Sequence, residues 1–336
     1  MVECPQLAVF ETKKGGKKKA AGHLKVIQAN VFKQHTFLDY IRGGAANNAW
    51  ELNMVVGIDF TGSNGNPAQP GTLHYCNLQG GGGAPPNPYE QTIMGLASVL
   101  EQYDSDQQLP CYGFGARGPD RKVSHCFPLN GNPQNPYVNG VQGVMDAYHT
   151  ALTQWGLSGP TNFAQIIGAA ASMSTRHVQQ GKKVYTILLI ITDGAITDMQ
   201  ATKNAIVAAA NLPLSLLIVG VGNEQFEAMT ELDGDDGQGL HNSQGVKTPR
   251  DIVQFVRFND FATAAPGRLA KEALHELPGQ MLKYFKDHQI NPPPVQAYTA
   301  PADGGGGGAA AQVIEVSAEE AAMGALGAQV LQAHIA

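Results

Sequence analysis

Carboxylate and hydroxyl side chains stand together at the ends of two strongly apolar stretches of the sequence. Asp59, Thr61 and Ser63 end one stretch in the pattern D-x-T-x-S, and Asp193 ends the other within Thr-Asp-Gly. We predict both stretches to be parallel strands, and doubly wound sheets bind ligands at the carboxyl ends of such strands. Carboxylate and hydroxyl oxygens are hard donors that suit Mg²⁺ rather than zinc or copper. The pattern therefore predicts a magnesium site that uses neither histidine nor cysteine.

Such a site requires a sheet that brings the two stretches side by side. Apolar, β-branched runs predict strands at residues 53–60, 184–192, 214–220 and 252–257. Helical periodicity bounded by Gly, Pro or Asn predicts helices at residues 89–103, 141–154, 162–180, 198–211 and 264–286. The strand runs are almost continuously apolar, as expected for central strands covered on both faces. The alternation predicts an α/β fold, a doubly wound and mostly parallel sheet flanked by helices, over residues 46–290.

The two ends of the chain differ from this core. Within residues 1–45, two short strand-like runs flank Thr12-Lys-Lys-Gly-Gly-Lys-Lys-Lys19, which predicts a β-hairpin with a basic tip. The lysines of the tip either stay solvated or contact anionic lipid headgroups. Residues 291–336 form a Pro/Gly/Ala-rich tail that we expect to be a flexible linker. A capping-box pattern at Ser317 predicts a short helix at residues 317–335 within this tail.

Composition limits the classes of function. The chain of 336 residues is 43% apolar and carries 22 Lys and Arg against 28 Asp and Glu, a formal charge of −6. Because no global positive field attracts nucleic acid, we expect no nucleic-acid partner. Four widely spaced cysteines predict reduced thiols rather than disulfides or a zinc site. The absence of a signal peptide and of a long apolar run predicts a cytoplasmic protein, able to lie peripherally at the plasma membrane.

Three further motifs are assigned to turns. Gly113-Phe-Gly-Ala-Arg-Gly118 satisfies G-x-G-x-x-G, but Pro119 and charged residues follow where a dinucleotide site needs a helix. Asp104-Ser-Asp106 and Asp233-Gly-Asp235 lack the rest of an EF-hand loop, and we predict that they are solvated turn acids.

The sequence contains no H-x-x-x-H spacing, no G-x-S-x-G elbow and no phosphate loop, so we predict a protein without enzymatic activity.

With Thr161 in Gly159-Pro-Thr-Asn-Phe163, the D-x-T-x-S and Thr-Asp-Gly patterns resemble the metal-ion-dependent adhesion site of von Willebrand A domains. The flanking sequence narrows the resemblance to the copine family. The segments that resemble copine sequence lie at residues 37–41, 57–65, 103–106, 113–116, 123–125, 159–163, 187–194, 218–223, 231–235 and 250–255.

The resemblance implies a binding mechanism for these residues. Thr61, Ser63 and, in the open state, Thr161 would hold Mg²⁺ through their hydroxyls, and Asp59 and Asp193 would hold it directly or through water. Mn²⁺ and Ca²⁺ are alternative ions. One coordination position would stay open for an Asp or Glu supplied by a protein partner. Thr61 stands where many A domains have Ser, and we expect its extra methyl group to tighten the site.

The resemblance leads to three hypotheses for function. The first is a Mg²⁺-dependent protein-interaction module. Copines typically carry paired calcium- and phospholipid-binding β-sandwich domains before the A domain, and residues 1–45 resemble only the last strands of the second sandwich plus a linker. The second hypothesis is therefore a calcium-dependent phospholipid-binding trafficking or signalling protein whose lipid domains lie outside this chain. The third is a structural subunit of a large assembly.

Overall fold

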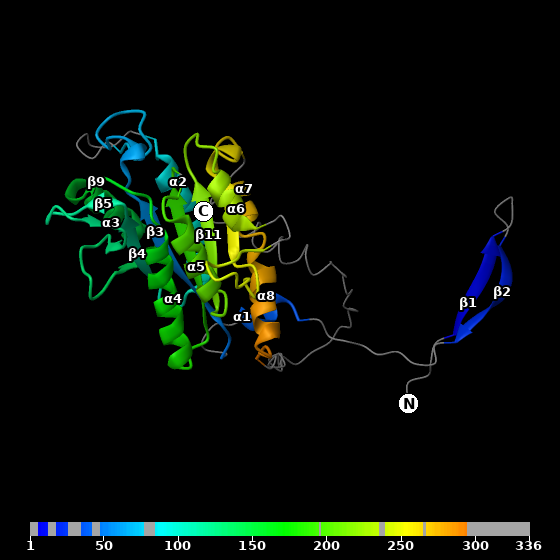
Figure 1. The fold of residues 1–336 in the computed structure, drawn as a ribbon. Helices are drawn as coiled ribbons and strands as arrows, with labels where there is room; N and C mark the ends of the chain where they lie inside the picture. Colours follow the sequence, from blue (N-terminus) through cyan, green and yellow to red (C-terminus); the bar gives the residue numbers. More distant parts are fainter. Residues whose placement is uncertain are drawn as a thin grey trace, which may run out of the picture. The chain divides into compact units, whose positions relative to one another are not determined.

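The computed structural model describes residues 6–12, 18–25, 35–41, 48–76, 85–194, 196–234, 239–264 and 267–293. The chain divides into two units, Met1–His35 and Thr36–Ala336. The larger unit is built around a central sheet with helices on both sides, as Figure 1 shows. None of the helices in the described ranges combines the length and apolar character needed to cross a bilayer.

The smaller unit contains the hairpin expected from the sequence. β1 (Gln6–Thr12) pairs with β2 (Lys18–Lys25) in antiparallel register, with an irregularity after Val9. The lysine-rich tip at residues 13–17 lies outside the described residues. So does the tail from residue 294 onward, with the helix predicted at residues 317–335.

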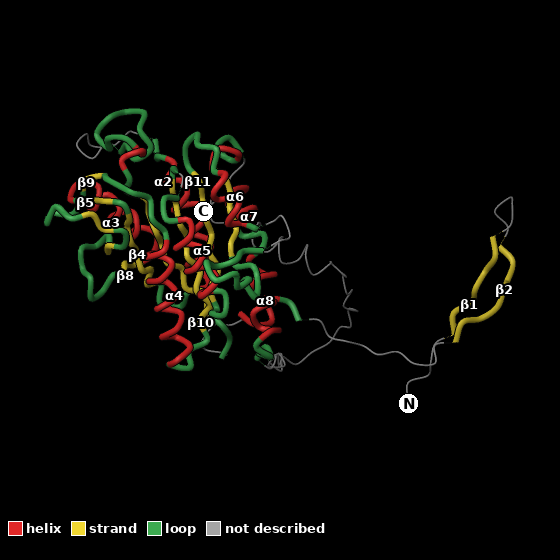
Figure 2. The backbone as a smooth tube through the Cα atoms, viewed as in Figure 1, coloured by secondary structure: helices red, strands yellow, loops and turns green. Residues whose placement is uncertain are grey.

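The central sheet confirms the predicted doubly wound, mostly parallel α/β architecture. Its strand order is β12-β11-β10-β3-β4-β7, and β8 pairs with the other part of β4. The first five strands are parallel neighbours, whereas β7 and β8 run antiparallel to β4. Figure 2 shows these strands as the yellow centre of the larger unit. The bounds are β3 Glu51–Asp59, β4 Gln108–Phe114, β7 Phe127–Pro128, β8 Tyr137–Asn139, β10 Val184–Thr192, β11 Leu214–Gly220 and β12 Val253–Arg257.

Apolar side chains bury both faces of this sheet. Every residue of β10 and of β11 is buried. Alternate side chains of β10 enter different cores: Ile187 and Leu189 belong to one cluster, Leu188 and Ile190 to the other. Full burial of such a side chain contributes about 1.5–3 kcal/mol. This two-sided burial explains why the strands are apolar without a period of two.

The helices divide between the two faces according to these clusters. The first cluster holds side chains of α1, α2, α3, α7 and α8, and the second holds side chains of α4, α5 and α6. The helix bounds are α1 Phe37–Ile41, α2 Pro88–Leu100, α3 Gly140–Gln154, α4 Ala164–Gln179, α5 Met199–Ala209, α6 Glu227–Asp233, α7 Arg268–Ala273 and α8 Leu277–Asp287. A small sheet of order β6-β5-β9 adjoins the end of β4, with bounds β5 Ala116–Arg117, β6 Val123–Ser124 and β9 Gly156–Leu157.

Several element predictions differ from the structure. The single helix predicted at residues 264–286 is wrong, because α7 ends at Ala273 and α8 begins at Leu277. Pro278 occupies the first turn of α8, where a missing N–H costs nothing, but it could not continue a helix from α7. β4 was not predicted, since Pro110 and Gly113 weaken its strand signal.

Candidate metal centre

Two of the predicted ligands end adjacent parallel strands. Asp59 is the last residue of β3, and Asp193 follows β10 directly. The two strands pair in register, with Ile58 opposite Ile191. Both carboxyl groups therefore lie at the carboxyl-terminal edge of the sheet. Both are withdrawn from water, because Asp59 is 0% exposed and Asp193 is 4% exposed.

The two predicted hydroxyl ligands after β3 converge on Asp193. Ser63 Oγ donates a hydrogen bond to Asp193 Oδ1 at 3.0 Å, and Thr61 Oγ1 lies 3.5 Å from the same oxygen. The two hydroxyl oxygens are themselves 3.0 Å apart. Ser63 lies on a short 3-10 turn, Gly62–Asn64, and is exposed, so the cluster opens to solvent on that side. An oxygen-rich cluster with one open side has the donor chemistry of a Mg²⁺ site.

Asp59 is held behind this cluster by donors on both of its oxygens. Thr61 N–H donates to Asp59 Oδ1 at 2.7 Å, and Thr192 Oγ1 donates to Asp59 Oδ2 at 2.5 Å. Because both oxygens already accept short hydrogen bonds, the orientation of the Asp59 carboxylate is fixed.

The electrostatics of the edge favour a cation. Burial raises the pKa of Asp193 to about 7, and the neighbouring charge of Asp59 adds to the rise, against the hydrogen bond from Ser63. Burial also raises the pKa of Asp59, although the hydroxyl of Thr192 and the groups of Thr61 oppose the shift. Two desolvated carboxylates therefore repel each other, and a bound divalent cation would relieve this repulsion.

Hydroxyl oxygens are as important as carboxylate oxygens among the groups that could hold a metal ion here. No three His, Cys, Asp or Glu side chains converge to hold a metal ion anywhere in the described ranges. Asp193, Thr61 and Ser63 together supply three neutral or anionic oxygens within hydrogen-bonding distance of one another. This donor set suits a hard cation that keeps several waters, which is typical of Mg²⁺.

Thr161, the fifth predicted ligand, lies on a neighbouring loop and is 7% exposed. Its carbonyl accepts a hydrogen bond from Thr197 N–H at 2.8 Å, and no hydrogen bond joins its hydroxyl to the other four residues. The loop nevertheless runs beside them, because Ser158 pairs with Thr61 as a β-bridge and accepts from Gly62 N–H at 2.7 Å. The structure thus brings together four predicted ligands, with the fifth on an adjoining segment.

The turn that carries Thr61 and Ser63 is anchored by Asn64, which the sequence interpretation missed. Asn64 is 2% exposed, and its amide donates to the carbonyl oxygen of Thr61 at 3.2 Å. The hydroxyl of Tyr89 on α2 donates to Asn64 Oδ1 at 2.6 Å. Asn64 therefore connects the turn that carries Thr61 and Ser63 to α2.

A second anchor, His74, holds the backbone of Asp59. His74 is 0% exposed, and its Nε2 lies 2.7 Å from the carbonyl oxygen of Asp59. A carbonyl only accepts, so Nε2 carries the proton and Nδ1 accepts from the Tyr148 hydroxyl, 2.7 Å away. Burial lowers the pKa of His74 to about 3, so the ring is neutral at physiological pH.

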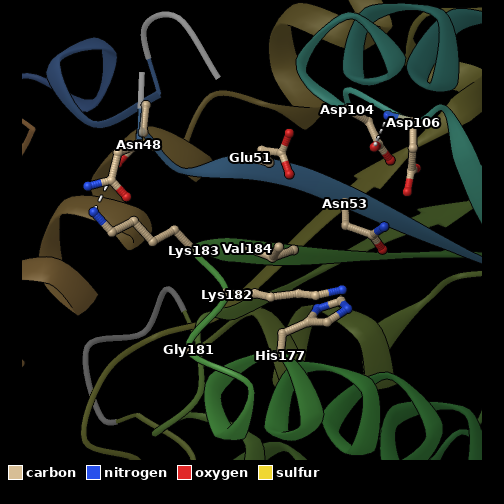
Figure 3. A pocket seen from close by; sticks show the side chains of 11 residues that line it. Asn48, Glu51, Asn53, Asp104, Asp106, His177, Gly181, Lys182, Lys183 and Val184 are labelled. Atoms are coloured by element: carbon tan, nitrogen blue, oxygen red, sulfur yellow. Dashed lines mark hydrogen bonds between the residues drawn. The ribbon is translucent and has the colours of Figure 1, made fainter. Parts of the chain in front are cut away.

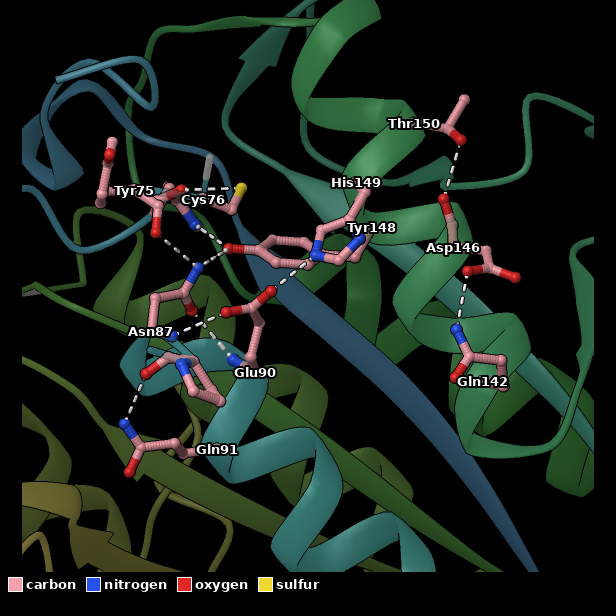
Figure 4. Close-up of polar contacts among 12 residues, drawn as sticks. Tyr75, Cys76, Asn87, Glu90, Gln91, Gln142, Asp146, Tyr148, His149 and Thr150 are labelled. Carbon is pink, nitrogen blue, oxygen red and sulfur yellow. Dashed lines mark hydrogen bonds and ion pairs between the residues drawn. The ribbon is translucent and has the colours of Figure 1, made fainter. Parts of the chain in front are cut away.

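This network continues from Tyr148 towards the surface, as Figure 4 shows. Asn87 Nδ2 donates to the Tyr148 hydroxyl at 3.3 Å, and Asn87 also forms a capping box with Glu90 at the start of α2. Glu90 Oε1 pairs with His149 Nε2 at 2.6 Å. A continuous chain of polar contacts therefore connects the backbone of Asp59 with the partly exposed contact between Glu90 and His149.

Sequence signals for these supporting residues are weak. Asn64 directly follows the D-x-T-x-S pattern, and Thr192 directly precedes Asp193, so proximity to the motif could have indicated both. His74 and Tyr148 are 74 positions apart in the sequence, and no local pattern connects them. Only the packing of the loop after β3 against α3 brings them into contact.

The G-x-G-x-x-G segment was predicted to be a turn, but it consists of the end of β4, a bend at Gly115 and the strand β5, and it also shapes the candidate metal centre. Gly115 adopts a φ of 76° between β4 and β5. A Cβ atom at Gly115 would lie 2.4 Å from the Cγ2 methyl of Thr61. The methyl that distinguishes Thr61 from Ser thus occupies space that a side chain at position 115 would need.

The other predicted turn acids differ from expectation. Asp104 and Asp233 were predicted to be solvated, but they are 8% and 7% exposed. Asp233 accepts from Phe255 N–H at 2.7 Å, which links α6 to β12. The described cysteines, Cys76, Cys111 and Cys126, are free thiols, as expected.

Comparison with known proteins decides the family. The family model named Copine matches residues 72–293. Protein BONZAI 1 of Arabidopsis thaliana is 45% identical over 281 residues, which cover 82% of this chain and 47% of that protein. The chain belongs to the copine family. Protein BONZAI 2 of the same plant is 46% identical over 259 residues, covering 77% of this chain and 42% of its own length.

This copine chain spans about half the length of the two curated relatives it matches. Among solved structures, a manganese-loaded TRAP protein of Plasmodium vivax aligns with 63% of this chain and 71% of its own, at 12% identity and a TM-score of 0.37. Proximal thread matrix protein 1 of the mussel byssus covers 67% of this chain and 48% of its own, at 13% identity and a TM-score of 0.37.

Proposed function

We propose that this copine domain binds Mg²⁺ at the edge formed by Asp59, Thr61, Ser63, Thr161 and Asp193, and uses the ion to hold a protein partner. The observation that carries the proposal is the convergence of the Thr61 and Ser63 hydroxyls on Asp193 Oδ1. These distances bring the two hydroxyl oxygens and the carboxylate oxygen close enough together to contact one ion. When bound, the ion would supply a Lewis-acidic position that attracts an anionic ligand.

The residues have distinct roles in this proposal. Asp193, Ser63 and Thr61 would contact the ion, while Asp59 would act through water because both of its oxygens accept internal hydrogen bonds. Thr161 would join them through its hydroxyl in an open state of the site, since its loop runs beside Thr61 and Gly62. The exposure of Ser63 leaves room for the carboxylate of a partner's Asp or Glu.

Isothermal titration of the full, metal-stripped chain with MgCl₂ tests the metal proposal. We expect one site in the wild-type chain and loss of at least ten-fold affinity in Asp193→Asn, because the isosteric amide removes the charge but not the shape. Asp146→Asn is the matched control, since Asp146 is an exposed acid on α3. Equal heats from wild type and Asp193→Asn would contradict the proposal. MnCl₂ and CaCl₂ titrations rank the alternative ions.

The partner half of the proposal needs a separate experiment. Affinity capture with wild type and Asp193→Asn, each with Mg²⁺ and with EDTA, should retain a protein only on the wild type with Mg²⁺. A shortened peptide of that protein should lose binding when one Asp or Glu is changed to Asn or Gln. Sedimentation of the chain with phosphatidylserine vesicles in Ca²⁺, and not in EDTA, would instead favour a lipid-binding function.

A further inference from the structure

A second polar site lies at the opposite edge of the sheet. A pocket of about 320 Å³ opens at the amino-terminal ends of β3 and β10, where Glu51 and Val184 begin these strands. Glu51 and Asp59 are eight residue steps apart along β3, a distance of roughly 26 Å at about 3.3 Å per residue. The pocket is therefore separate from the metal centre. Its volume is at the lower end of the range for small-ligand pockets, about 300–1,000 Å³.

The side chains that line this pocket come from three parts of the fold. Glu51 comes from β3, Asp104 and Asp106 come from the turn before β4, and His177 and Lys182 come from the end of α4 and the turn after it. Figure 3 shows the three acids grouped in the upper part of the view, with His177 and Lys182 below them. Elements far apart in the sequence thus contribute to one concave surface.

The pocket contains buried hydrogen-bonding atoms without partners. Glu51 Oε1, Asp104 Oδ2 and His177 Nδ1 are each shielded from solvent and form no hydrogen bond. Asp104 as a whole is only 8% exposed, and its other oxygen accepts a long bond of 3.4 Å from Asp106 N–H. Buried polar atoms are normally satisfied, and each exception needs a cause. When the two acids are ionised, their unpartnered oxygens can only accept, so they indicate a missing donor.

The charges of the pocket favour a cationic donor. Three carboxylates face two lysines, and the ammonium of Lys183 is already bonded to the carbonyl oxygen of Asn48 at 2.9 Å. Burial raises the pKa of Asp104 to about 7, and the nearby charges of Asp106 and Glu51 add to the rise. A cation placed among these acids would remove their repulsion and satisfy the unpartnered oxygens together.

The acids that line the pocket favour an extended cation over a metal ion. A metal requires ligands within about 2.0–2.6 Å of one point. In the described part of the chain, no three His, Cys, Asp or Glu side chains meet that requirement, and this includes Glu51, Asp104, Asp106 and His177. A guanidinium group is planar and carries five donors directed outwards, so it can satisfy acceptors that do not share a centre. An ammonium group concentrates three donors on one atom, so it reaches separate acceptors less well than a guanidinium does.

We propose that the pocket bounded by Glu51, Asp104 and Asp106 is a binding site for the guanidinium group of arginine. The guanidinium bonds to the free oxygens of Glu51 and Asp104, and the remaining pocket volume accepts the aliphatic part of the side chain. The arginine comes from a protein segment or from the free amino acid. The site is independent of the metal centre, so either can be present without the other.

Nuclear magnetic resonance titration of the full ¹⁵N-labelled chain tests this site. The probes are N-acetyl-arginine methylamide, free L-arginine, the neutral isostere N-acetyl-citrulline methylamide, N-acetyl-lysine methylamide and CaCl₂. We expect the arginine amide to shift the amide signals of Glu51, Asp104 and His177 and to bind at least ten-fold more tightly than the lysine probe, with no shift from citrulline. Stronger binding of free L-arginine than of the amide would identify the free amino acid as the source, and the reverse a protein segment.

Isosteric variants separate binding from folding. Asp104→Asn and Glu51→Gln should each weaken binding of the arginine amide at least ten-fold, while Asp260→Asn, an exposed acid beyond β12, should leave it unchanged. Mg²⁺ affinity should be the same in all three variants, which distinguishes this site from the metal centre. The proposal is overturned if citrulline binds as well as arginine, if CaCl₂ alone shifts these signals, or if no probe does.

Discussion

Thr192 Oγ1 donates a hydrogen bond to Asp59 Oδ2 at 2.5 Å, and this bond joins the ends of β10 and β3 directly behind the candidate metal centre. Both residues are 0% exposed, so water cannot replace either partner. The Thr61 backbone N–H occupies the other oxygen of Asp59. The orientation of the carboxylate is therefore set by its own strand and by the neighbouring one before any ion binds.

Thr192→Val should destabilise the protein and weaken the proposed metal site. Valine keeps the shape of threonine but leaves Asp59 Oδ2 buried without a donor, which costs about 1–3 kcal/mol. Loss of a hydrogen bond that orients a metal ligand typically lowers the affinity for the metal by about 10–100-fold. We expect both effects, measured as the free energy of unfolding in urea and as the Mg²⁺ dissociation constant by calorimetry.

Thr186→Val on the same strand is the matched control. Thr186 is also 0% exposed, but its hydroxyl has no hydrogen-bond partner. Its replacement should therefore leave stability unchanged or raise it, and leave Mg²⁺ affinity unchanged. If Thr192→Val and Thr186→Val lower the free energy of unfolding equally, the hydrogen bond between Thr192 and Asp59 does not stabilise the fold.

Tyr148→Phe should show that the polar network behind Asp59 supports the site. The change leaves His74 Nδ1 without its donor and removes the acceptor of Asn87 Nδ2. Because these groups are buried, we expect a loss of about 1–3 kcal/mol in the free energy of unfolding. Mg²⁺ affinity should also fall, since His74 holds the backbone of Asp59.

Tyr112→Phe provides the comparison for this variant. Tyr112 is half-buried on β4, and its hydroxyl forms no hydrogen bond with a described residue. We expect its unfolding free energy to stay within about 0.5 kcal/mol of wild type. Unchanged stability and Mg²⁺ affinity in Tyr148→Phe would show that the network is only a packing feature.

The sequence predicted the strands that are apolar throughout and the ligands that follow them. β10 and β11 have the predicted bounds because a strand buried on both faces has a continuous apolar signal. β4 escaped prediction because it contains Pro110 and two of its partners are short antiparallel strands. The break between α7 and α8 was missed although Pro278 marks it, because the apolar periodicity continues through both helices.

The candidate site was predictable only where one short motif holds it. Asp59, Thr61 and Ser63 are close in sequence, and the strand pattern added Asp193. His74 and Tyr148 depend on the packing of α3 against the loop after β3, which no local spacing encodes. Asp104 was predicted to be solvated because turns usually lie at the surface. Its burial arises from the approach of β3 and the end of α4 around it.

Arg250→Lys should destabilise the fold without reaching the metal centre. Arg250 is 4% exposed and donates to the carbonyl oxygens of Ala210, Leu212 and Leu214, at 2.9, 2.6 and 2.7 Å. It also donates to Tyr185 Oη at 3.2 Å and to the Gln280 carbonyl at 3.3 Å. Lysine keeps the charge but has three donors on one atom, so several carbonyls lose their partner.

The expected loss for this variant is about 2–4 kcal/mol in urea unfolding, since two or more buried acceptors become unsatisfied. Arg257→Lys is the control, because Arg257 is exposed and its guanidinium donates only a 3.3 Å hydrogen bond, to the Glu224 carbonyl, among the described residues. Its stability should change by less than about 0.5 kcal/mol. A loss below about 0.5 kcal/mol in Arg250→Lys as well would show that the position requires positive charge and not the fork of donors.

The pocket acid Asp104 should make stability depend on pH in an unusual direction. Its pKa is raised from 3.8 to about 7, first by burial and then by the charge of Asp106. Between these two values the folded chain holds a proton that the unfolded chain has released. The free energy of unfolding therefore decreases as pH rises through this window, and the loss is complete above about pH 7. Glu51, His177 and Lys182 face the same pocket and modulate the effect.

Asp104→Asn removes this titration. As pH rises from 5 to 8, the free energy of unfolding of the variant should therefore increase relative to that of wild type by about 1–2 kcal/mol. This value includes a reduction for solvent screening at the mouth of the pocket. Urea unfolding at half-unit steps of pH measures the difference. His177→Gln, examined in parallel, should retain the Asp104 contribution because the acids remain. Parallel curves for wild type and Asp104→Asn across this range would mean that Asp104 is ionised in the folded protein at pH 5. A bound arginine should flatten the wild-type curve in the same window, because the guanidinium stabilises the ionised carboxylate and lowers its pKa.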